Sequence, residues 1–349
     1  MSTSPDSVPL MRLSVLVPAR NERDCVGDCL RSLVAQEEDG WRLGQEWEIL
    51  LVDDHSTDET RAIAEGVAGV TVMEAPALEK GWTGKANAVW AGAQAARGEW
   101  LLFTDADTVH ELGSASRAVV EAERHEVAML SYSPRQIVRG FWQRALMPQV
   151  FSELAMTYPP AKVSDPESKL AAANGQFLLV RRDVYFANGG HEAVKNAVLE
   201  DVELARTVKR RKQGLRFRYA PEAVAARMYR TIGAMVEGWT KNLALLFGNP
   251  LAIAAWRLLD LLLLFGLPVL AWWTQAVSTR RILWVVVLLL WVRTVWRVYR
   301  RLAKSNFPFV DRLIAPLGIP LFAALLYRSW FQHTVTKRVS WKGREYPGD

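Results

Sequence analysis

Short apolar runs alternate with amphipathic or alanine-rich stretches over the first two-thirds of the chain. Four short runs rich in apolar residues have the length of buried parallel strands. They lie at 13–17, 49–52, 70–74 and 100–104. Helices are predicted between them, at 24–36, 58–66 and 84–97. Strands that alternate with helices predict an α/β domain on a mostly parallel sheet.

Polar segments follow three of these strands, at 18–22, 53–58 and 104–108. In open parallel sheets, ligands bind beyond the carboxyl ends of the strands. We therefore expect the three segments to meet in one crevice and form an active site. No glycine fingerprint of dinucleotide or P-loop sites is present in the chain, which weakens those alternatives.

From Leu243 onward the chain becomes rich in Leu, Val and Trp and loses most acidic residues. Apolar segments at 253–277, 282–296 and 313–331 approach or exceed the length that crosses a bilayer. Tryptophans near their ends favour membrane helices over buried core helices. We expect a catalytic domain over 1–240, transmembrane or interfacial helices over 241–335, and a basic membrane-surface tail over 336–349.

Two details of these apolar segments carry further expectations. Arg257 and Asp260 lie three residues apart inside the first segment, where charge is costly. They are expected to face protein, to pair with each other, or to lie where the span begins. Pro316, Gly318 and Pro320 should break a straight helix in the third segment, so that it does not cross the membrane cleanly.

The net charge of +6 is distributed in clusters and forms no single stripe, so we expect no nucleic-acid partner. Clusters beside apolar spans suit anionic lipid headgroups, although solvated helix ends are an equal alternative. The clusters are 209–212, 297–304 and 337–344. Cys25 and Cys29 are expected to be reduced residues on one helix face. The polar N-terminus lacks a signal-peptide pattern, so the soluble domain should stay in the cytoplasm.

Several residues in this crevice offer chemistry. Asp105 and Asp107, at a strand end, suit Mg²⁺ or Mn²⁺, although such pairs also occur by chance. Asp53 or Asp54 could accept bonds from a nucleoside, or an acid here could cap the next helix. Lys85 opens a helix after a glycine-bracketed loop, where a phosphate could bind.

Two later pairs remain open on spacing alone. Glu200 and Asp201 could supply a general base, or could be acids favoured at a helix N-terminus. Arg227 and Arg230 would share one face if helical and could bind a diphosphate or lipid headgroups.

An ordered set of motifs over residues 12–240 resembles the family-2 glycosyltransferases of the GT-A fold. The set is Val17–Glu22, Val52–Asp58, Gly81–Lys85, Thr104–Asp107 and Leu199–Asp201. Four segments make the resemblance more specific: the Gly81–Lys85 loop, Tyr158-Pro159, Ala173–Gln176 and Trp341–Tyr346. They are similar to the membrane-attached group that contains hopene-associated and carotenoid glycosyltransferases. Ceramide glucosyltransferases and polyprenyl-phosphate sugar transferases are similar at a greater distance.

The resemblance implies a role for each matching residue. Asp201 would be the catalytic base, supported by Glu200. Gly175 and Gln176 would lie near the donor sugar or acceptor. Asp107, with Asp105, would hold the metal. The residues along the nucleotide would be Pro18, Ala19, Glu22, Asp53, Lys85 and Asp105, with Arg227 and Arg230 on the diphosphate.

Many processive relatives carry Gln-x-x-Arg-Trp after the base, whereas here Thr231 follows Arg230. The resemblance therefore implies one inverting sugar transfer, from a nucleotide sugar to a lipid such as a hopanoid or carotenoid. Polyprenyl-phosphate and ceramide acceptors are alternatives, as are a nucleotidyltransferase and a non-catalytic membrane scaffold. The segment 141–158 is expected to be an interfacial helix where the acceptor enters, or ordinary core. The enzyme would be a multi-pass membrane protein with its catalytic domain in the cytoplasm.

Overall fold

The computed structural model describes residues 11–36, 40–275, 281–341 and 344–347. The polar N-terminus, the end of the first apolar segment at 276–277, and residues 342–343 of the tail lie outside them. The chain divides into two compact units. One comprises 1–137 and 160–228; the other comprises 138–159 and 229–349. This division differs from the expected boundary at residue 240, because 138–159 and 229–240 group with the apolar helices.

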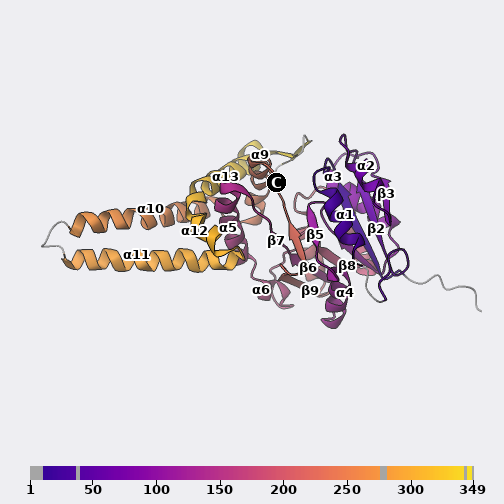
Figure 1. Cartoon of the computed structure of the whole chain (residues 1–349), viewed down its shortest axis with the longest axis horizontal. Coiled ribbons are helices and arrows are strands. Elements are labelled where there is room, and N and C mark those ends of the chain that lie inside the picture. Colours follow the sequence, from indigo (N-terminus) through magenta and orange to yellow (C-terminus); the bar gives the residue numbers. More distant parts are fainter. Residues whose placement is uncertain (1–10, 37–39, 276–280, 342–343, 348–349) are drawn as a thin grey trace, which may run out of the picture. The chain divides into compact units, whose positions relative to one another are not determined.

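The first unit is built on a mixed sheet that orders its described strands β3-β2-β1-β4-β8-β6-β9 (Figure 1). The pairs among β3, β2, β1 and β4 are parallel, as is β6 with β9, whereas β8 runs antiparallel to both neighbours. The strands are β1 (Leu13–Ala19), β2 (Trp47–Asp53), β3 (Val70–Glu74), β4 (Trp100–Phe103), β6 (Met129–Ser133), β8 (Leu178–Arg181) and β9 (Leu215–Tyr219). A smaller sheet joins β5 (Thr108–His110), β10 (Val224–Ala226) and β7 (Arg135–Gln136).

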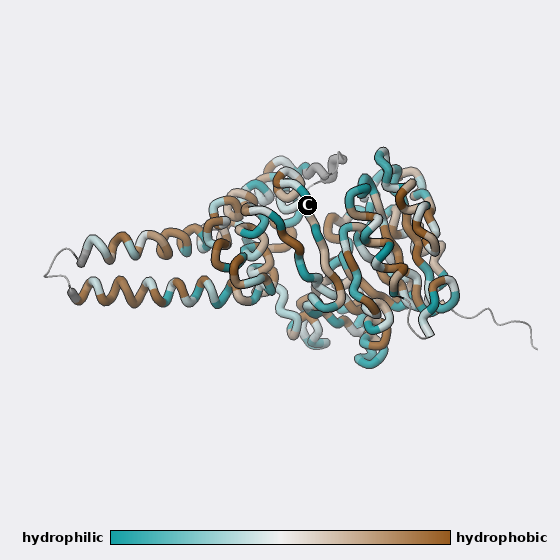
Figure 2. Tube along the Cα trace, viewed as in Figure 1, coloured by the Kyte–Doolittle hydropathy of each residue, from teal (hydrophilic) through white to brown (hydrophobic). Residues whose placement is uncertain are grey.

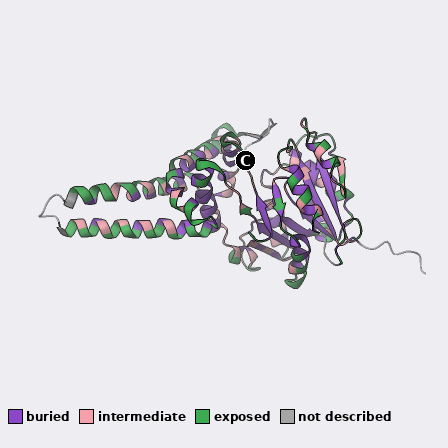
Figure 3. Ribbon diagram, viewed as in Figure 1, coloured by how far each residue is buried: buried purple, intermediate pink, exposed green. Residues whose placement is uncertain are grey.

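Helices connect these strands and pack against both faces of the sheet, so buried apolar residues lie on each face. The helices are α1 (Val26–Val34), α2 (Thr60–Glu65), α3 (Gly84–Ala95), α4 (Ser114–Arg124), α6 (Pro160–Ser164), α7 (Arg182–Ala187) and α8 (Glu200–Arg210). Leu13, Val15 and Val17 of β1 pack in one buried cluster with Leu30 and Leu33 of α1. Figure 3 shows the sheet as the most buried part of this unit. A strand buried on both faces reads as a continuous apolar run, which is why the pattern identified it.

The predicted elements of this unit are confirmed with small shifts in their ends. The strand at 70–74 is β3 as expected. The prediction that residues 18–22 form a loop is wrong at its start, since β1 continues through Pro18 and Ala19, which pair with Val52 and Asp53. A proline is tolerated there because β4 pairs with β1 only as far as Leu16, so no ladder hydrogen bond is needed from Pro18 on that side.

The second unit is helical, apart from a terminal hairpin of β11 (Arg338–Trp341) and β12 (Arg344–Pro347). Its long helices are α5 (Gly140–Thr157), α9 (Ile232–Leu246), α10 (Pro250–Gln275), α11 (Arg281–Leu302) and α13 (Ile319–Phe331). Three stretches are long and apolar enough to cross a membrane: Pro250–Trp273, Ile282–Ser305 and Phe309–Thr336. The predicted class, an α/β domain followed by apolar helices, is confirmed.

Helices α10 and α11 lie side by side and expose much of their apolar surface (Figures 2 and 3). Leu262, Trp272 and Ile282 are each more than 60% exposed, at 66%, 74% and 84%. Contiguous apolar surface of this extent is costly in water and marks contact with another apolar phase. Both helices are long and apolar enough to cross a bilayer.

The third stretch is broken where its prolines predicted. A helix α12 (Phe309–Ile314) is followed by a 3₁₀ turn, Ala315–Gly318, before α13 begins. A break leaves backbone carbonyls without helical partners. Gln149 of α5 donates its side-chain N–H to the carbonyl of Ala315 (2.8 Å). Gly318 lies so close to α5 that a Cβ there would meet the Ala145 carbonyl oxygen at 2.3 Å.

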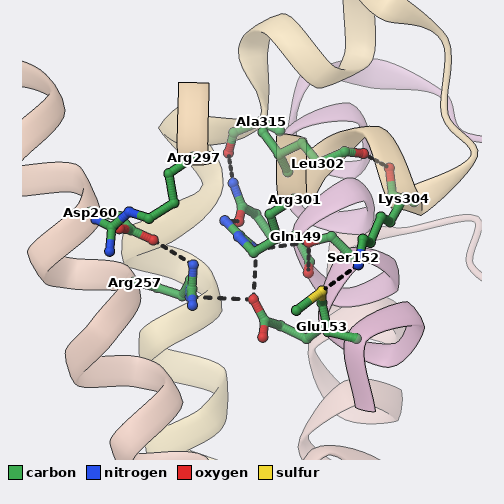
Figure 4. Close-up of polar contacts among 12 residues, drawn as sticks. Gln149, Ser152, Glu153, Arg257, Asp260, Arg297, Arg301, Leu302, Lys304 and Ala315 are labelled. Atoms are coloured by element: carbon green, nitrogen blue, oxygen red, sulfur yellow. Dashed lines mark hydrogen bonds and ion pairs between the residues drawn. The ribbon is translucent and has the colours of Figure 1, made fainter. Parts of the chain in front are cut away.

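Five charged side chains form an alternating chain that joins α5, α10 and α11 (Figure 4). Arg301 donates to Glu153 (2.6 Å), and Arg257 Nε lies 3.3 Å from the same carboxylate. Arg257 also pairs with Asp260, as expected, and Arg297 binds the other oxygen of Asp260 (2.5 Å). Each carboxylate thus contacts two guanidinium groups, which makes burial of the charges tolerable.

We expect Glu153→Ala to destabilise the second unit strongly, because it leaves the guanidinium groups of Arg301 and Arg257 facing each other without that carboxylate. Breaking a buried pair from one side costs about 3–5 kcal/mol. Thermal unfolding of the full chain in detergent measures the effect, with Arg300→Ala, an exposed change on α11, as control. Equal melting temperatures for the two variants would contradict this account.

Candidate active site

The centre of the site is the ammonium group of Lys85. Lys85 lies in the first turn of α3, whose N-cap Thr83 accepts the backbone N–H of Ala86 (3.2 Å). Its Nζ lies 2.8 Å from Asp105, just after β4, and 3.0 Å from Glu200, the first residue of α8. One cation therefore joins three elements that are far apart in the sequence.

Lys85 stays charged in this position. Burial alone would lower its pKa, but the carboxylates of Asp105, Glu200 and Asp201 outweigh burial and raise the pKa well above the usual lysine value. The site thus holds a permanent cation beside a helix N-terminus, where anions bind favourably.

Asp201 differs from Lys85 because its surroundings disfavour its charged form. Burial and the adjacent Glu200 raise its pKa to about 6, although Lys85 and backbone N–H groups act against them. Its Oδ2 accepts the N–H of Gly175 (2.7 Å), and its Oδ1 accepts that of Val202 (2.8 Å). A carboxylate with a raised pKa and a fixed orientation is suited to accept a proton near neutral pH.

Gly175 is required by the closeness of these groups. A Cβ at this position would lie 2.9 Å from Lys85 Nζ and 3.5 Å from Asp201 Oδ2. Any side chain would push the ammonium group out of place. This closeness is the physical reason for glycine at position 175. The family resemblance implies that this segment lies near the donor sugar or acceptor.

Asp107 lies next to Gln176, whose amide N–H approaches Asp107 Oδ1 at 3.4 Å. The backbone N–H of Arg227 donates to the Asp107 carbonyl oxygen (3.0 Å), so the backbone of Arg227 lies beside the polar segment that follows β4. Within the described residues no cluster of three or more His, Cys, Asp or Glu is arranged to hold a metal. Mg²⁺ needs only one or two carboxylates when phosphate oxygens and waters complete its shell, and Asp105 and Asp107 fit that requirement.

The loops after β1 and β2 are joined as expected. Asn21 Oδ1 accepts the N–H of Thr57 (2.8 Å), and the N–H of Glu22 donates to Thr60 Oγ1 (2.7 Å). The buried Asp53 accepts the N–H of Ser56 with both oxygens, at 3.4 and 3.3 Å. These loops therefore form one continuous edge of the crevice.

One pocket brings together six of the residues selected from the sequence. They are Pro18, Lys85, Asp105, Gly175, Glu200 and Asp201. The other selected residues of this unit lie outside its lining: Ala19, Glu22, Asp53, Asp107, Gln176 and Arg227.

Arg230 belongs to the second unit. The condition under which Arg227 and Arg230 would share a helix face does not hold, because residues 227–231 are not helical and α9 begins only at Ile232. Cys25 and Cys29 are free thiols, as expected, and burial raises the pKa of Cys29 to about 12.

Sequence reasoning missed His191, which lines the same pocket. It follows Gly189 and Gly190, both with positive φ, in a short 3₁₀ turn. A Cβ on Gly190 would meet Trp90 and Tyr185 at 2.6 Å, so the glycine lets the backbone approach an aromatic cluster. A glycine pair before a histidine, ten residues from Asp201, was the available signal.

Comparisons with known proteins place the chain among the glycosyltransferases. Residues 14–186 match the sequence model described as "Glycosyl transferase family 2". The chain is 25% identical to a 4,4'-diaponeurosporenoate glycosyltransferase of Staphylococcus aureus strain USA300, over 96% of this chain and 88% of the relative. The predicted resemblance to this family, and within it to carotenoid glycosyltransferases, is confirmed.

Solved structures show weaker likeness. The mannosyltransferase PcManGT from Pyrobaculum calidifontis, in complex with GDP-Man and Mn2+, is 16% identical over 93% of this chain and 88% of that chain (TM-score 0.46). TarS 1-349 of S. aureus, in complex with UDP, is 17% identical over 97% of each chain (TM-score 0.43). At these scores the likeness assigns no residue of this chain.

Replacing Lys85 should destabilise the first unit in a pH-dependent way. Lys85→Met leaves Asp105, Glu200 and Asp201 without their cation. Because Lys85 is 38% exposed and solvent screens it, we expect a loss of about 1–2 kcal/mol at pH 7.5. The folded state then binds protons more tightly than the unfolded chain, so stability should recover as the pH falls through 6.

Thermal unfolding at pH 7.5 and pH 5 measures this difference. Lys80→Met, at an exposed lysine on the preceding loop, is the matched control. A loss of the same size at both pH values would show that the charge balance of the three carboxylates is not its cause.

Proposed function

We propose that this chain, a glycosyltransferase whose residues 14–186 match the family-2 sequence model, moves one sugar from a nucleotide-sugar donor to a lipid acceptor. The observation that supports it best is the pairing of two opposite groups in one pocket. Lys85 is a permanent cation, whereas Asp201 is a carboxylate with a pKa raised to about 6. Transfer from a nucleoside diphosphate needs both: positive charge for the leaving group and a base for the acceptor.

The proposed reaction is a single inverting displacement. Asp201 takes the proton from the acceptor oxygen, which forms a bond to the anomeric carbon from the face opposite the diphosphate. The bond between that carbon and the diphosphate oxygen breaks, and the electron pair leaves with the nucleoside diphosphate. Lys85 neutralises charge on the diphosphate, with Arg227 and Arg230 as further cations. Pro18, Ala19, Glu22 and Asp53 would contact the nucleoside, and Glu200 would support the base.

Asp105 and Asp107 would hold Mg²⁺ or Mn²⁺ together with diphosphate oxygens. Such an ion, when bound, supplies further positive charge against the departing diphosphate. The solved structure of PcManGT is a complex with GDP-Man and Mn2+, which supports a divalent ion here.

The acceptor class is proposed from two sources. The named relative acts on diaponeurosporenoate, a carotenoid acid, and this chain matches nearly its whole length. The exposed apolar helices α10 and α11 would place the enzyme where such a lipid dissolves. We therefore propose an integral membrane enzyme with its catalytic unit on the cytoplasmic side, and a carotenoid, hopanoid or related lipid as acceptor.

Membrane vesicles of defined orientation test the donor, the acceptor and the orientation together. Inverted vesicles that contain the protein are given UDP- and GDP-sugars with carotenoid acids, hopanoids, polyprenyl phosphates or ceramides. A new glycolipid, identified by mass, should form without detergent in inverted vesicles and only after lysis in right-side-out vesicles. Product that forms equally well with Asp201→Asn, or no product from any donor, would contradict the proposal.

The rate should depend on pH through Asp201. A base must be ionised, so kcat/KM should be full above its pKa and fall as the pH drops through about 6. Asp201→Asn should lower turnover at least about 10²-fold, leave donor binding nearly intact and abolish this acidic limb. Glu203→Gln, on the same helix, should preserve the profile. A limb that persists in Asp201→Asn would assign the base elsewhere.

Donor binding should depend on a divalent ion and on Asp107. Chelation should abolish transfer, and Mg²⁺ or Mn²⁺ should restore it. Asp107→Ala should weaken binding of the nucleotide sugar in the presence of metal, measured by calorimetry, but not in excess chelator. The exposed Asp165→Ala is the control. Wild-type affinity in Asp107→Ala with metal present would remove this carboxylate from the metal site.

A further inference from the structure

His191 is a buried, neutral imidazole in the wall of the active-site pocket. It is 2% exposed, and it lines the pocket together with Glu200, Asp201 and Lys85. Burial lowers its pKa to about 4, so the ring carries no charge near neutral pH. The reaction described above gives this residue no part.

The hydrogen bonds around His191 determine which ring nitrogen carries the proton. The hydroxyl of Tyr185 lies 2.7 Å from Nδ1, and the same oxygen accepts the backbone N–H of His191 (3.1 Å). Burial raises the pKa of Tyr185, so the hydroxyl keeps its proton. Among the described residues no other acceptor for this hydroxyl is recorded, so its proton is donated to Nδ1. The hydrogen of the neutral ring is therefore on Nε2.

The imidazole is held rigidly in this state. The ring of Phe103 packs edge-on against it with centroids 5.1 Å apart, and Tyr185 lies at 5.7 Å. Tyr185 is itself packed by Trp90 and Phe186. Nδ1 has its partner in Tyr185, whereas among the described residues no hydrogen bond to Nε2 is recorded. Nε2 is not one of the fully enclosed polar atoms that lack a partner among the described residues, so it keeps access to the pocket that the ring lines, where a ligand can accept its hydrogen.

We propose that His191 Nε2–H and the carboxylate of Glu200 form a recognition site for one hydroxyl of the transferred sugar. A hydroxyl both accepts and donates a hydrogen bond, and this pair offers one donor and one acceptor. A neutral donor held by packing discriminates strongly against a sugar that lacks the hydroxyl, since the analogue leaves this N–H without an acceptor. His191 is then a specificity residue that contacts substrate. The inference rests on the proposed function.

The test compares His191→Phe with the wild type in the full-length protein. Phenylalanine keeps a ring in the aromatic cluster and removes the N–H. The probes are the best nucleotide sugar of the wild type, analogues that lack one sugar hydroxyl at a time, and the free nucleoside diphosphate. We expect kcat/KM for the intact donor to fall about 10- to 100-fold, the usual effect of a lost buried hydrogen bond.

Two further results are expected. For the analogue that lacks the recognised hydroxyl, kcat/KM should be the same in the wild type and in His191→Phe. Affinity for the free nucleoside diphosphate should not change. Tyr185→Phe, which removes the group that fixes the tautomer, should show the same donor dependence with a smaller loss. If His191→Phe unfolds, His191→Gln, which retains an N–H donor, should retain part of the discrimination.

His110 provides a matched control. It is also buried and neutral, but its Nε2 bonds to Thr104 and Thr108 and it is not a lining residue of the pocket. His110→Phe should affect all donors equally. The same uniform loss in His191→Phe, or weaker binding of the free nucleoside diphosphate, would show a packing role and overturn the inference. Wild-type protein that binds no nucleotide sugar would overturn the proposed function itself, and this inference with it.

Discussion

The ion pairs of Lys85 hold the site together. Asp105 follows a central strand, Glu200 opens a helix 95 residues later, and one ammonium group contacts both. Without that cation three carboxylates would lie together in a partly dry pocket, and at least one would take up a proton. Because burial and Glu200 outweigh Lys85 at Asp201, the pKa of Asp201 stays raised, at about 6. Stability and reactivity of the pocket thus depend on one charge.

The second unit must accommodate charged groups among apolar helices. Its apolar helices expose surface that water cannot accommodate, yet they carry five charged groups on α5, α10 and α11. The alternation from Arg301 through Glu153, Arg257 and Asp260 to Arg297 gives every charge an opposite neighbour. Such a chain fixes the rotation of each helix about its axis, which apolar contacts alone specify poorly. It also explains how α5, distant in sequence, becomes part of this unit.

Local patterns were sufficient for the first four strands and for part of the pocket. Strands buried on both faces must be continuously apolar, so β1, β2, β3 and β4 were visible as runs, and the polar residues after them had to meet at one edge. Prolines cannot continue a helix, so the break before α13 was also visible. The expected roles of Asp201 and Glu200, in contrast, came from the family resemblance. Spacing alone favoured acids that merely complement a helix dipole.

The sequence by itself determined the α/β domain, the apolar helices and the strand ends that form the crevice, because these depend on the periodicity of neighbouring residues. Tertiary structure alone decided what depends on distant partners. It raised the pKa of Asp201 through burial beside Glu200, and it placed Arg227 and Arg230 on a segment without helical geometry. It also set the proton of His191 on Nε2 through Tyr185. Protonation and orientation are properties of an environment, and that environment exists only once the chain has folded.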